Sequence, residues 1–170
     1  MLSGRAGRTG LAQAVDSVII GIPGLQVLSQ GTFEAGRAWL VETMDPVLVG
    51  TYVLALWLRS IQPIPVGRRG EIEFPAGWYL YVGSALGPGG MPARLARHRR
   101  RLGPTKRPHW HVDYLRRRAA VVGVWRGTGD ECRRSRWTAR LPGATIPAPG
   151  FGSSDCRCPS HLVHFAALPK

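Results

Sequence analysis

The segment near the C-terminus carries side chains of the kind that bind metal ions. Cys156-Arg-Cys158-Pro-Ser-His161 offers two thiols and an imidazole, and donors of these types hold Zn²⁺ in tetrahedral sites. His109 and His111 are candidates for a fourth ligand, whereas Cys132 stands alone in the sequence. Zn²⁺ is therefore one interpretation of this cluster. The alternative is a pair of buried cysteines in a well-packed loop, because a free cysteine behaves as a small apolar side chain.

A strongly basic segment precedes this cluster. The chain of 170 residues has 23 Lys and Arg against 10 Asp and Glu, a formal net charge of +13. Between residues 92 and 141, where most of the basic residues lie, the acidic residues are Asp113, Asp130 and Glu131. Such one-sided charge is typical of a surface that contacts a polyanion. Nucleic acid, DNA ahead of RNA, is the expected partner, and a solvated surface without phosphate contacts is the alternative.

A helix within the basic segment groups several cationic side chains. It is predicted to begin after the glycine-rich loop Leu86–Gly90, since Pro92 is tolerated in a first turn, and to end at Gly103-Pro104. One side carries Met91, Leu95 and Leu102. Another carries residues at i, i+3, i+4 and i+7, which share a face: Arg94, Arg97, His98 and Arg101.

The surrounding elements indicate an α+β fold. Residues rich in β-branched and aromatic types predict strands at 47–58 (with Gly50 inside), 70–74, 78–84, 121–125 and 161–168. Further helices are predicted at 110–118 and 131–141, a proline-containing turn at 62–69, and a loop at 143–154. Because the first connections are short, antiparallel pairing is favoured. We expect a small, mainly antiparallel central sheet flanked by helices.

The first part of the chain differs from the rest. Residues 1–45 contain scattered glycines and a weak helical pattern around 33–44, and we expect an N-terminal extension that is poorly ordered or not native, with a functional start at Met44. Residues 46–170 then form the domain. The apolar run Ser17–Leu28 is interrupted by glycine and proline and is too short to span a bilayer. Three cysteines do not make a disulfide framework, so we expect no membrane segment, no export and a cytoplasmic location.

Several blocks together resemble a known superfamily. Gly50-Thr51-Tyr52, then Tyr81-Val82-Gly83, then a helix with Arg94-Leu95 and His98, resemble the core of the GIY-YIG endonucleases. The stretches FPAGWYLYVGSALGPGG, ARLARH, HWHVDYL and GFGSSDCRCPSHL are similar to the small stand-alone Uri-type branch. The resemblance covers roughly residues 48–168. The gap between Tyr52 and Tyr81 is longer than is usual in the superfamily, which implies an inserted hairpin around 63–75.

The resemblance implies a metal-dependent endonuclease that hydrolyses phosphodiester bonds. Such hydrolysis needs a deprotonated water and a counter-charge for the phosphate. Tyr81 would be the general base, with Tyr52 hydrogen-bonding beside it. A phenol has a pKa of about 10, so a nearby cation must lower the pKa. Arg94 would clamp the phosphate through its planar fork, and His98 would orient water or a phosphate oxygen.

Other basic and aromatic residues would bind the nucleic acid. The candidates are Arg97, Arg101, Lys106 and Arg107 for the backbone and Trp110 for stacking on a base. Each site residue also has a structural interpretation. The tyrosines and Trp110 could pack in a core, and Arg94 and His98 could be ordinary surface residues.

The cation ligand is where the sequence departs from the superfamily. The superfamily holds one divalent cation, Mg²⁺ or Mn²⁺, with a glutamate from a later helix. Arg133, Arg134 and Arg136 occupy that region here, and an arginine would oppose cation binding. Glu131, at the start of the predicted helix, is the remaining candidate. Three hypotheses follow: an active endonuclease, a catalytically inactive nucleic-acid-binding module on the same scaffold, and a small zinc-stabilised structural domain.

Overall fold

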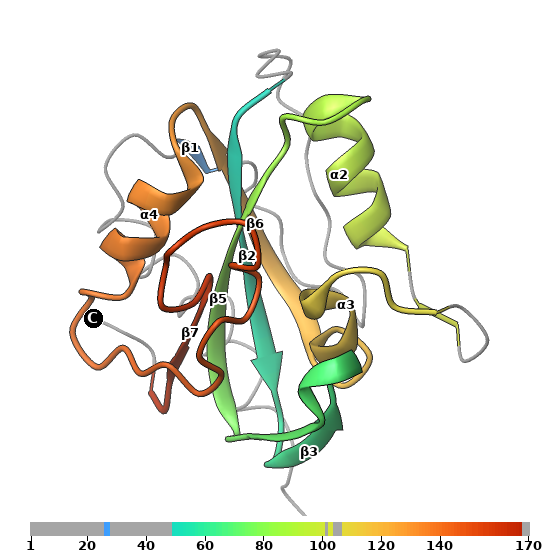
Figure 1. Ribbon diagram of the computed structural model, residues 1–170, viewed down its shortest axis with the longest axis vertical. Coiled ribbons are helices and arrows are strands. Elements are labelled where there is room, and N and C mark those ends of the chain that lie inside the picture. The colour runs from blue at the N-terminus through green and yellow to red at the C-terminus, as the bar shows by residue number, and fades with distance from the viewer. Residues whose placement is uncertain (1–25, 28–48, 101, 104–106, 168–170) are drawn as a thin grey trace, which may run out of the picture.

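A five-stranded antiparallel sheet forms the centre of the computed structural model (Figure 1). The structure describes residues 26–27, 49–100, 102–103 and 107–167. The strand order is β1 (Gln26–Val27), β6 (Ala120–Gly127), β2 (Thr51–Leu58), β5 (Gly77–Ser84) and β7 (Leu162–Phe165). The predicted α+β class with a mainly antiparallel sheet is therefore confirmed.

The central strand β2 begins one residue after Gly50. Gly50 has a φ of 149°, and a Cβ at this position would lie 2.4 Å from the Gly127 carbonyl oxygen. Only glycine can approach its neighbour so closely in this conformation. The prediction that Gly50 lies inside a strand at 47–58 is therefore wrong, because this residue makes the bend that leads into β2.

A separate hairpin follows β2. Strands β3 (Gln62–Pro65) and β4 (Glu71–Phe74) form a two-stranded sheet around the short 3₁₀ helix η1 (Gly67–Arg69). The expected inserted hairpin at 63–75 is confirmed, but the prediction of a simple turn at 62–69 is wrong. Proline is tolerated in this strand because a two-stranded sheet consists of edges.

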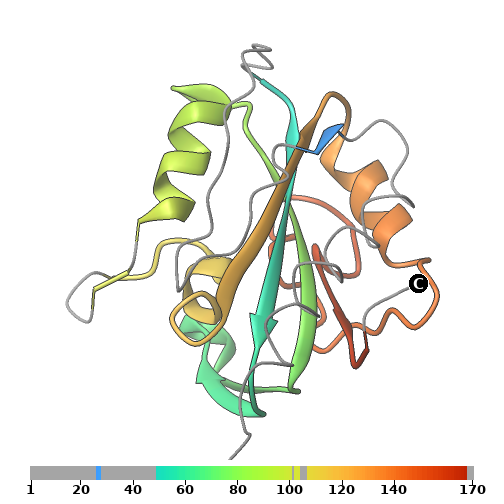
Figure 2. The same cartoon turned by 180° about the vertical axis from the view of Figure 1, so that it is seen from behind.

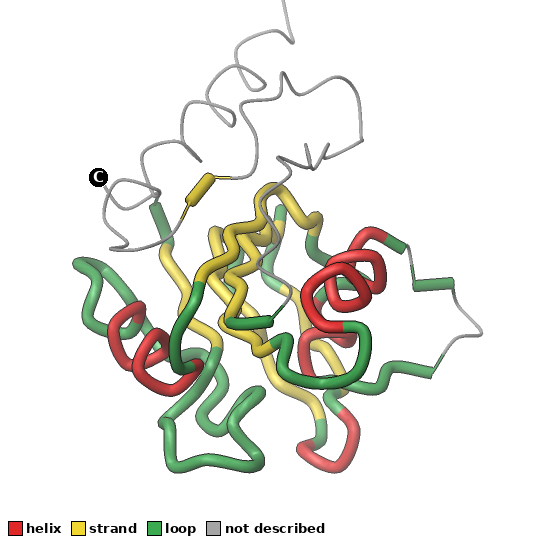
Figure 3. Tube along the Cα trace, turned by 90° about the horizontal axis from the view of Figure 1, so that it is seen from above, coloured by secondary structure: helices red, strands yellow, loops and turns green. Residues whose placement is uncertain are grey.

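The helices lie on two flanks of the sheet. Helices α2 (Gly90–Arg99) and α3 (His111–Leu115) lie on one flank and α4 (Glu131–Thr138) on the other, as Figures 1 and 2 show. Seen from above (Figure 3), the strands run between these two groups of helices. All three helices are shorter than predicted. Helix α2 ends before Gly103 because the guanidinium group of Arg116 donates to the carbonyl oxygens of His98 and, at 3.0 Å, Arg100.

Each face of the sheet packs an apolar cluster. On the first face, alternate residues of β2 and β5 pack with buried side chains of α2 and α3 and with Phe151 of the loop before β7. On the second face, Trp125 and Phe165 belong to a smaller cluster, which continues with Leu141 after α4. The first face is the one that carries Tyr52 and Tyr81.

The first 45 residues contribute one described element. Gln26 and Val27 form β1, which pairs with Arg126 and Trp125 of β6. The helical pattern predicted at 33–44 lies outside the described residues. Within the part of the chain that the structure describes, no helix has both the length and the apolar character needed to cross a bilayer.

Candidate functional site

The two phenols predicted from the sequence are neighbours on one face of the sheet. Tyr52 of β2 lies opposite Gly83 of β5, and Tyr81 lies opposite Leu54. Tyr52 and Tyr81 are thus diagonal partners, within reach of each other for aromatic side chains. A Cβ at Gly83 would lie 2.4 Å from the Oη atom of Tyr52, so the Tyr52 ring passes directly over this glycine.

His98 contacts Tyr52 from helix α2. Its Nε2 atom lies 2.9 Å from the Tyr52 hydroxyl, and only 3% of the histidine is exposed. Burial lowers the pKa of His98 to about 3, and the positive charge of Arg116 acts in the same direction. The imidazole is therefore neutral at physiological pH. The predicted role of orienting water or a phosphate oxygen stays a prediction, since the bond that the structure shows is to the phenol.

Arg94 acts electrostatically on both phenols. Its charge acts to lower the pKa of Tyr52 and of Tyr81. Its Cζ atom lies 4.4 Å from the centre of the Trp110 ring, at a distance typical of cation–π contact. Tyr52 and Tyr81 are therefore neighbours under the influence of the Arg94 charge, and the catalytic roles implied for the three residues stay predictions.

Trp110 and Arg97 belong to the support of this site. The Cζ atom of Arg97 lies 4.1 Å from the centre of the Trp110 ring, and the Arg97 guanidinium contacts Asp113 at 2.5 Å. Trp110 is half-buried and packs against the first apolar cluster. Contacts of Arg97 and Trp110 with nucleic acid stay predictions, as does that of the exposed Arg107. Arg101 and Lys106 lie outside the described residues.

Asp113 organises the base of the site and was not predicted as a functional residue. Its buried carboxylate accepts hydrogen bonds from the backbone N–H groups of His109 (3.0 Å) and Trp110 (3.1 Å), and it pairs with Arg97 and Arg116. Burial alone would raise the pKa of Asp113, but the two backbone bonds and Arg97 outweigh it and lower the pKa. Its oxygens are thus engaged by four donors. A signal was present in the sequence, because Asp113 is an isolated acidic residue in the first turn of a predicted helix within a basic segment.

Burial keeps both phenols protonated. It raises the pKa of Tyr52 and of Tyr81 above the ordinary value, and the charge of Glu131 raises both further. Arg94 acts in the opposite direction but does not outweigh burial. A phenol in this environment can become a base only if a further positive charge is brought beside it.

Glu131 is the first residue of α4 and interacts with both the phenols and His161. Its charge affects both phenols more strongly than that of Asp113 does. Its Oε1 atom also lies 3.0 Å from the Nδ1 atom of His161. The pKa of His161 is lowered by burial, but the contact with Glu131 more than offsets this and raises the pKa overall.

The arginines of α4 have other positions. Arg134 donates to the Thr51 hydroxyl at 2.9 Å and to the Thr128 carbonyl at 2.6 Å, and so ties α4 to the start of β2. Arg133 and Arg136 are exposed. Glu131, in the first turn of the same helix, instead contacts His161 and acts electrostatically on the phenols.

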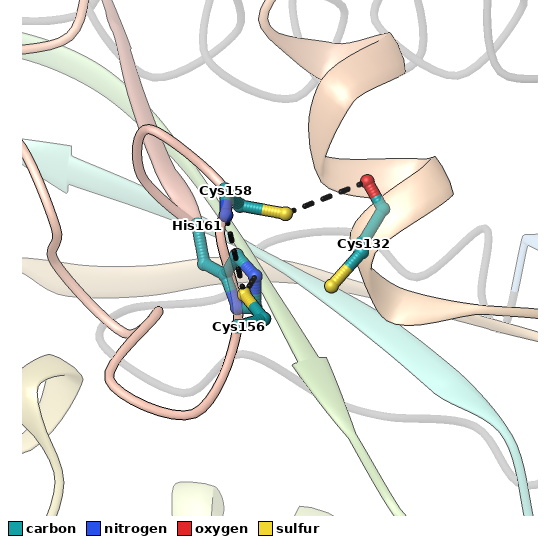
Figure 4. Close-up of side chains that lie close together, drawn as sticks. All are labelled: Cys132, Cys156, Cys158 and His161. Carbon is teal, nitrogen blue, oxygen red and sulfur yellow. Dashed lines mark hydrogen bonds between the residues drawn. The ribbon is translucent and has the colours of Figure 1, made fainter.

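Four metal-binding side chains meet beside Glu131. The ligand atoms of Cys132, Cys156, Cys158 and His161 all lie within 4.8 Å of one another, and this Cys₃His centre could hold a metal ion. Figure 4 shows Cys132 on α4 facing the other three, which come from the loop before β7. The Nε2 atom of His161 lies 3.3 Å from the Cys156 sulfur, and the Cys158 backbone N–H donates to the same sulfur at 3.5 Å.

The fourth member of this centre is therefore Cys132 and not one of the predicted histidines. His111 accepts a hydrogen bond from the Gly152 backbone N–H at 2.8 Å, and the ring of His109 packs against Trp110. Cys132, which is isolated in the sequence, lies next to Cys156, Cys158 and His161 in the folded protein. Its proximity to the loop depends on the packing of α4, which leaves no local signal in the sequence.

The protonation of the thiols follows from their crowding. Burial and the neighbouring thiols raise the pKa of Cys132 to about 12. Burial also acts to raise the pKa of Cys156, but the Cys158 backbone N–H and the other two thiols outweigh it and lower the pKa. A sulfur that already accepts a backbone hydrogen bond is the natural first ligand for an incoming cation.

Comparison with known proteins assigns the region that contains this site to a protein family. The family model described as "Domain of unknown function DUF123" matches residues 51–170. The chain belongs to this family. The DUF123 match begins at Thr51, the first residue of β2, and includes the phenols, Arg94, Glu131 and the Cys₃His centre. No curated protein and no solved structure matches the chain.

Proposed function

We propose that this DUF123 protein is a metal-dependent endonuclease that hydrolyses phosphodiester bonds of nucleic acid. The observation that carries the proposal is that two neighbouring phenols lie within the electrostatic influence of one guanidinium and one carboxylate. Tyr52, Tyr81, Arg94 and Glu131 come from four different elements, and the charges of Arg94 and Glu131 act on both phenols. Perturbed ionisable groups gathered in this way are typical of catalytic sites.

The residues divide the chemistry between them. Arg94, held over the Trp110 ring, offers a planar fork of donors that suits two phosphate oxygens. Tyr81 is the general base for the attacking water. Tyr52 lies beside it, and the Nε2 atom of His98 lies 2.9 Å from the Tyr52 hydroxyl and fixes it. His98 thus acts as a positioning residue through Tyr52.

Glu131 is the residue proposed to hold a divalent cation, Mg²⁺ or Mn²⁺. Magnesium takes oxygen ligands and commonly uses one or two carboxylates. The donors present fit this requirement, because Glu131 offers a partly exposed carboxylate whose charge acts on both phenols, whereas Asp113 is engaged by its own donors. A bound cation would supply the positive charge that phenol ionisation needs at this site.

The cofactor proposed for the Cys₃His centre is Zn²⁺. Three thiolates and an imidazole are the donor set of structural zinc sites. With Zn–S bonds near 2.3 Å, the ligand atoms of a tetrahedral site lie about 3.8 Å apart. The ligand atoms here lie within 4.8 Å of one another, so a small inward movement would complete the tetrahedron.

A catalytically inactive nucleic-acid-binding module is the second candidate. Two observations favour it: burial keeps both phenols protonated, and α4 carries arginines along its length. Such a module would bind DNA through its basic surface in a salt-sensitive manner without cutting it.

Nicking of supercoiled plasmid separates the two candidates. We expect cleavage with Mg²⁺ or Mn²⁺, none with chelator, and a loss of about 100-fold in Arg94→Ala, the scale of removing one donor to transition-state charge. Arg68→Ala, an exposed arginine of η1, is the matched control. Tyr81→Phe should also be inactive, whereas Tyr79→Phe on the same strand should remain active. Salt-sensitive DNA binding without nicking under either metal would reject the enzyme and leave the binding module.

A further inference from the structure

His161 links the Cys₃His centre to the proposed cation ligand. One ring nitrogen, Nε2, lies 3.3 Å from the Cys156 sulfur, inside the centre. The other, Nδ1, lies 3.0 Å from the Glu131 carboxylate. The His161 side chain is 3% exposed, so water has little access to either nitrogen. The two groups of side chains are therefore separated by a single imidazole.

Metal binding would fix the proton of this imidazole. An Nε2 atom that ligates a metal cannot carry a proton, so the proton resides on Nδ1, where it needs an acceptor. Nδ1 is buried and has no well-aligned hydrogen bond, although Glu131 Oε1 is close by. A small rotation of Glu131 would align the two, and a buried donor that is satisfied in this way holds its acceptor in place.

Cys132 provides a second link between the Cys₃His centre and Glu131, through the backbone of α4. The two residues are adjacent in the first turn of α4, whose N-terminus is capped by Asp130 through a bond of 2.7 Å from the Arg133 N–H. A metal ion held by Cys132 and His161 would join this turn to the loop before β7. The backbone of Glu131 and its carboxylate would then both be fixed.

The same loop also contacts the general base. A Cβ at Gly152 would lie 2.8 Å from the Tyr81 ring and 3.2 Å from the His161 Cβ, so Gly152 passes closely between these side chains. Gly152 has a φ of 75°, a conformation that favours glycine. Tyr81, the loop and His161 thus form one packed unit beside Glu131.

We propose that zinc in the Cys₃His centre orients Glu131, through His161 and Cys132, for binding of the second, catalytic cation. The inference rests on the proposed function, because it assigns the use of Glu131 in that site. His161 is a positioning residue under this proposal. Zinc occupancy would therefore control the affinity of the nuclease site for Mg²⁺ or Mn²⁺ as well as the stability of the loop.

His161→Cys tests the link without removing the zinc site. The variant keeps four zinc ligands but has no Nδ1 to contact Glu131. We expect one zinc per chain by elemental analysis and a native circular dichroism spectrum. Mn²⁺ affinity, measured from the electron paramagnetic resonance signal of free Mn²⁺, should fall at least about 10-fold, the lower end of effects seen when partners of metal ligands are lost. His164→Cys, the same substitution at a β7 histidine whose ring contacts Thr145 and Ala76 instead of Glu131, is the matched control and should bind Mn²⁺ like wild type.

Glu131→Gln separates failure of this inference from failure of the proposed function. We expect it to keep zinc and lose Mn²⁺ binding. If Glu131→Gln binds Mn²⁺ normally, the assignment of Glu131 in the nuclease site is wrong. If Glu131→Gln loses Mn²⁺ but zinc-loaded His161→Cys binds it normally, only the link is wrong.

Removal of zinc from the wild-type protein gives a measurement that does not depend on any substitution. Zinc-free and zinc-loaded protein should differ in Mn²⁺ affinity by at least the factor that separates wild type from His161→Cys, because zinc removal also releases the restraint through Cys132. Equal affinities, or wild-type protein purified under reducing conditions with far less than one zinc per chain, would overturn the proposal.

Discussion

Replacement of Asp113 by asparagine should destabilise the fold strongly, although it changes only charge and one donor group. The Asp113 carboxylate is fully buried and faces Arg116, whose side chain is 4% exposed, and Arg97, which is 31% exposed. Breaking a buried ion pair by removing one partner costs about 3–5 kcal/mol, because the other charge stays buried. The more exposed Arg97 contributes less, and asparagine still offers one acceptor to the backbone N–H groups of His109 and Trp110 just before α3. We therefore expect a loss of about 3 kcal/mol.

Urea unfolding followed by tryptophan fluorescence measures this loss. At roughly 2–4 °C per kcal/mol for a chain of this size, the melting temperature should fall by about 10 °C. Glu73→Gln, the same chemical change at an exposed position of β4, should alter stability by less than about 0.5 kcal/mol. If Asp113→Asn is as stable as Glu73→Gln, the negative charge of Asp113 does not contribute to stability through its four hydrogen-bond donors.

The pH dependence of this difference gives an independent check. The folded protein holds the pKa of Asp113 below its ordinary value. The stabilisation is therefore complete above the pKa of the unfolded chain, about 4, and is lost as the pH falls through the lower pKa of the folded state. The gap between wild type and Asp113→Asn should narrow in acid, and a constant gap would contradict the assignment.

Two further predictions concern Tyr52 and its neighbours. Burial, reinforced by Arg116, lowers the pKa of His98 to about 3, so below about pH 6.5 the unfolded chain binds a proton that the folded protein does not. This group should therefore lower the free energy of unfolding by up to about 1.4 kcal/mol per pH unit as the pH falls. His98→Gln should lose stability less steeply than wild type between neutral pH and about pH 5. Equal slopes for the two proteins would exclude His98 as the source. Gly83→Ala should lose about 1–3 kcal/mol, because its Cβ would lie 2.4 Å from the Tyr52 hydroxyl and must displace the ring. Gly103→Ala, with nothing within 4 Å of the added carbon, should have the same free energy of urea unfolding as wild type.

The sequence predicted the sheet better than the helix ends. Strands β2, β5 and β6 were expected near their observed positions because β-branched and aromatic residues follow a strand pattern there. The end of α2 was misplaced because it depends on Arg116, a residue distant in sequence that binds the last carbonyl groups. Hairpin strand β3 was missed because its two prolines resemble a turn, and only the pairing with β4 shows otherwise.

The candidate site likewise contains residues that the sequence could group and residues that it could not. Tyr52, Tyr81 and Arg94 could be grouped because their ordered motifs resemble those of a known superfamily. Cys132 could not be grouped with Cys156, because nothing local in the sequence records how α4 packs on the later loop. The contact of Glu131 with His161 and its effect on the phenols likewise required the tertiary structure.

The close passage of the Tyr52 ring over Gly83 has an evolutionary consequence. The two positions share one volume, so neither can change alone without a collision or a void. Among natural relatives of this chain, a side chain larger than hydrogen at the position of Gly83 should occur only together with a smaller residue in place of Tyr52. Homologues that have made this paired exchange would lack the phenol, and they would be the members of the DUF123 family in which to look for a different chemistry.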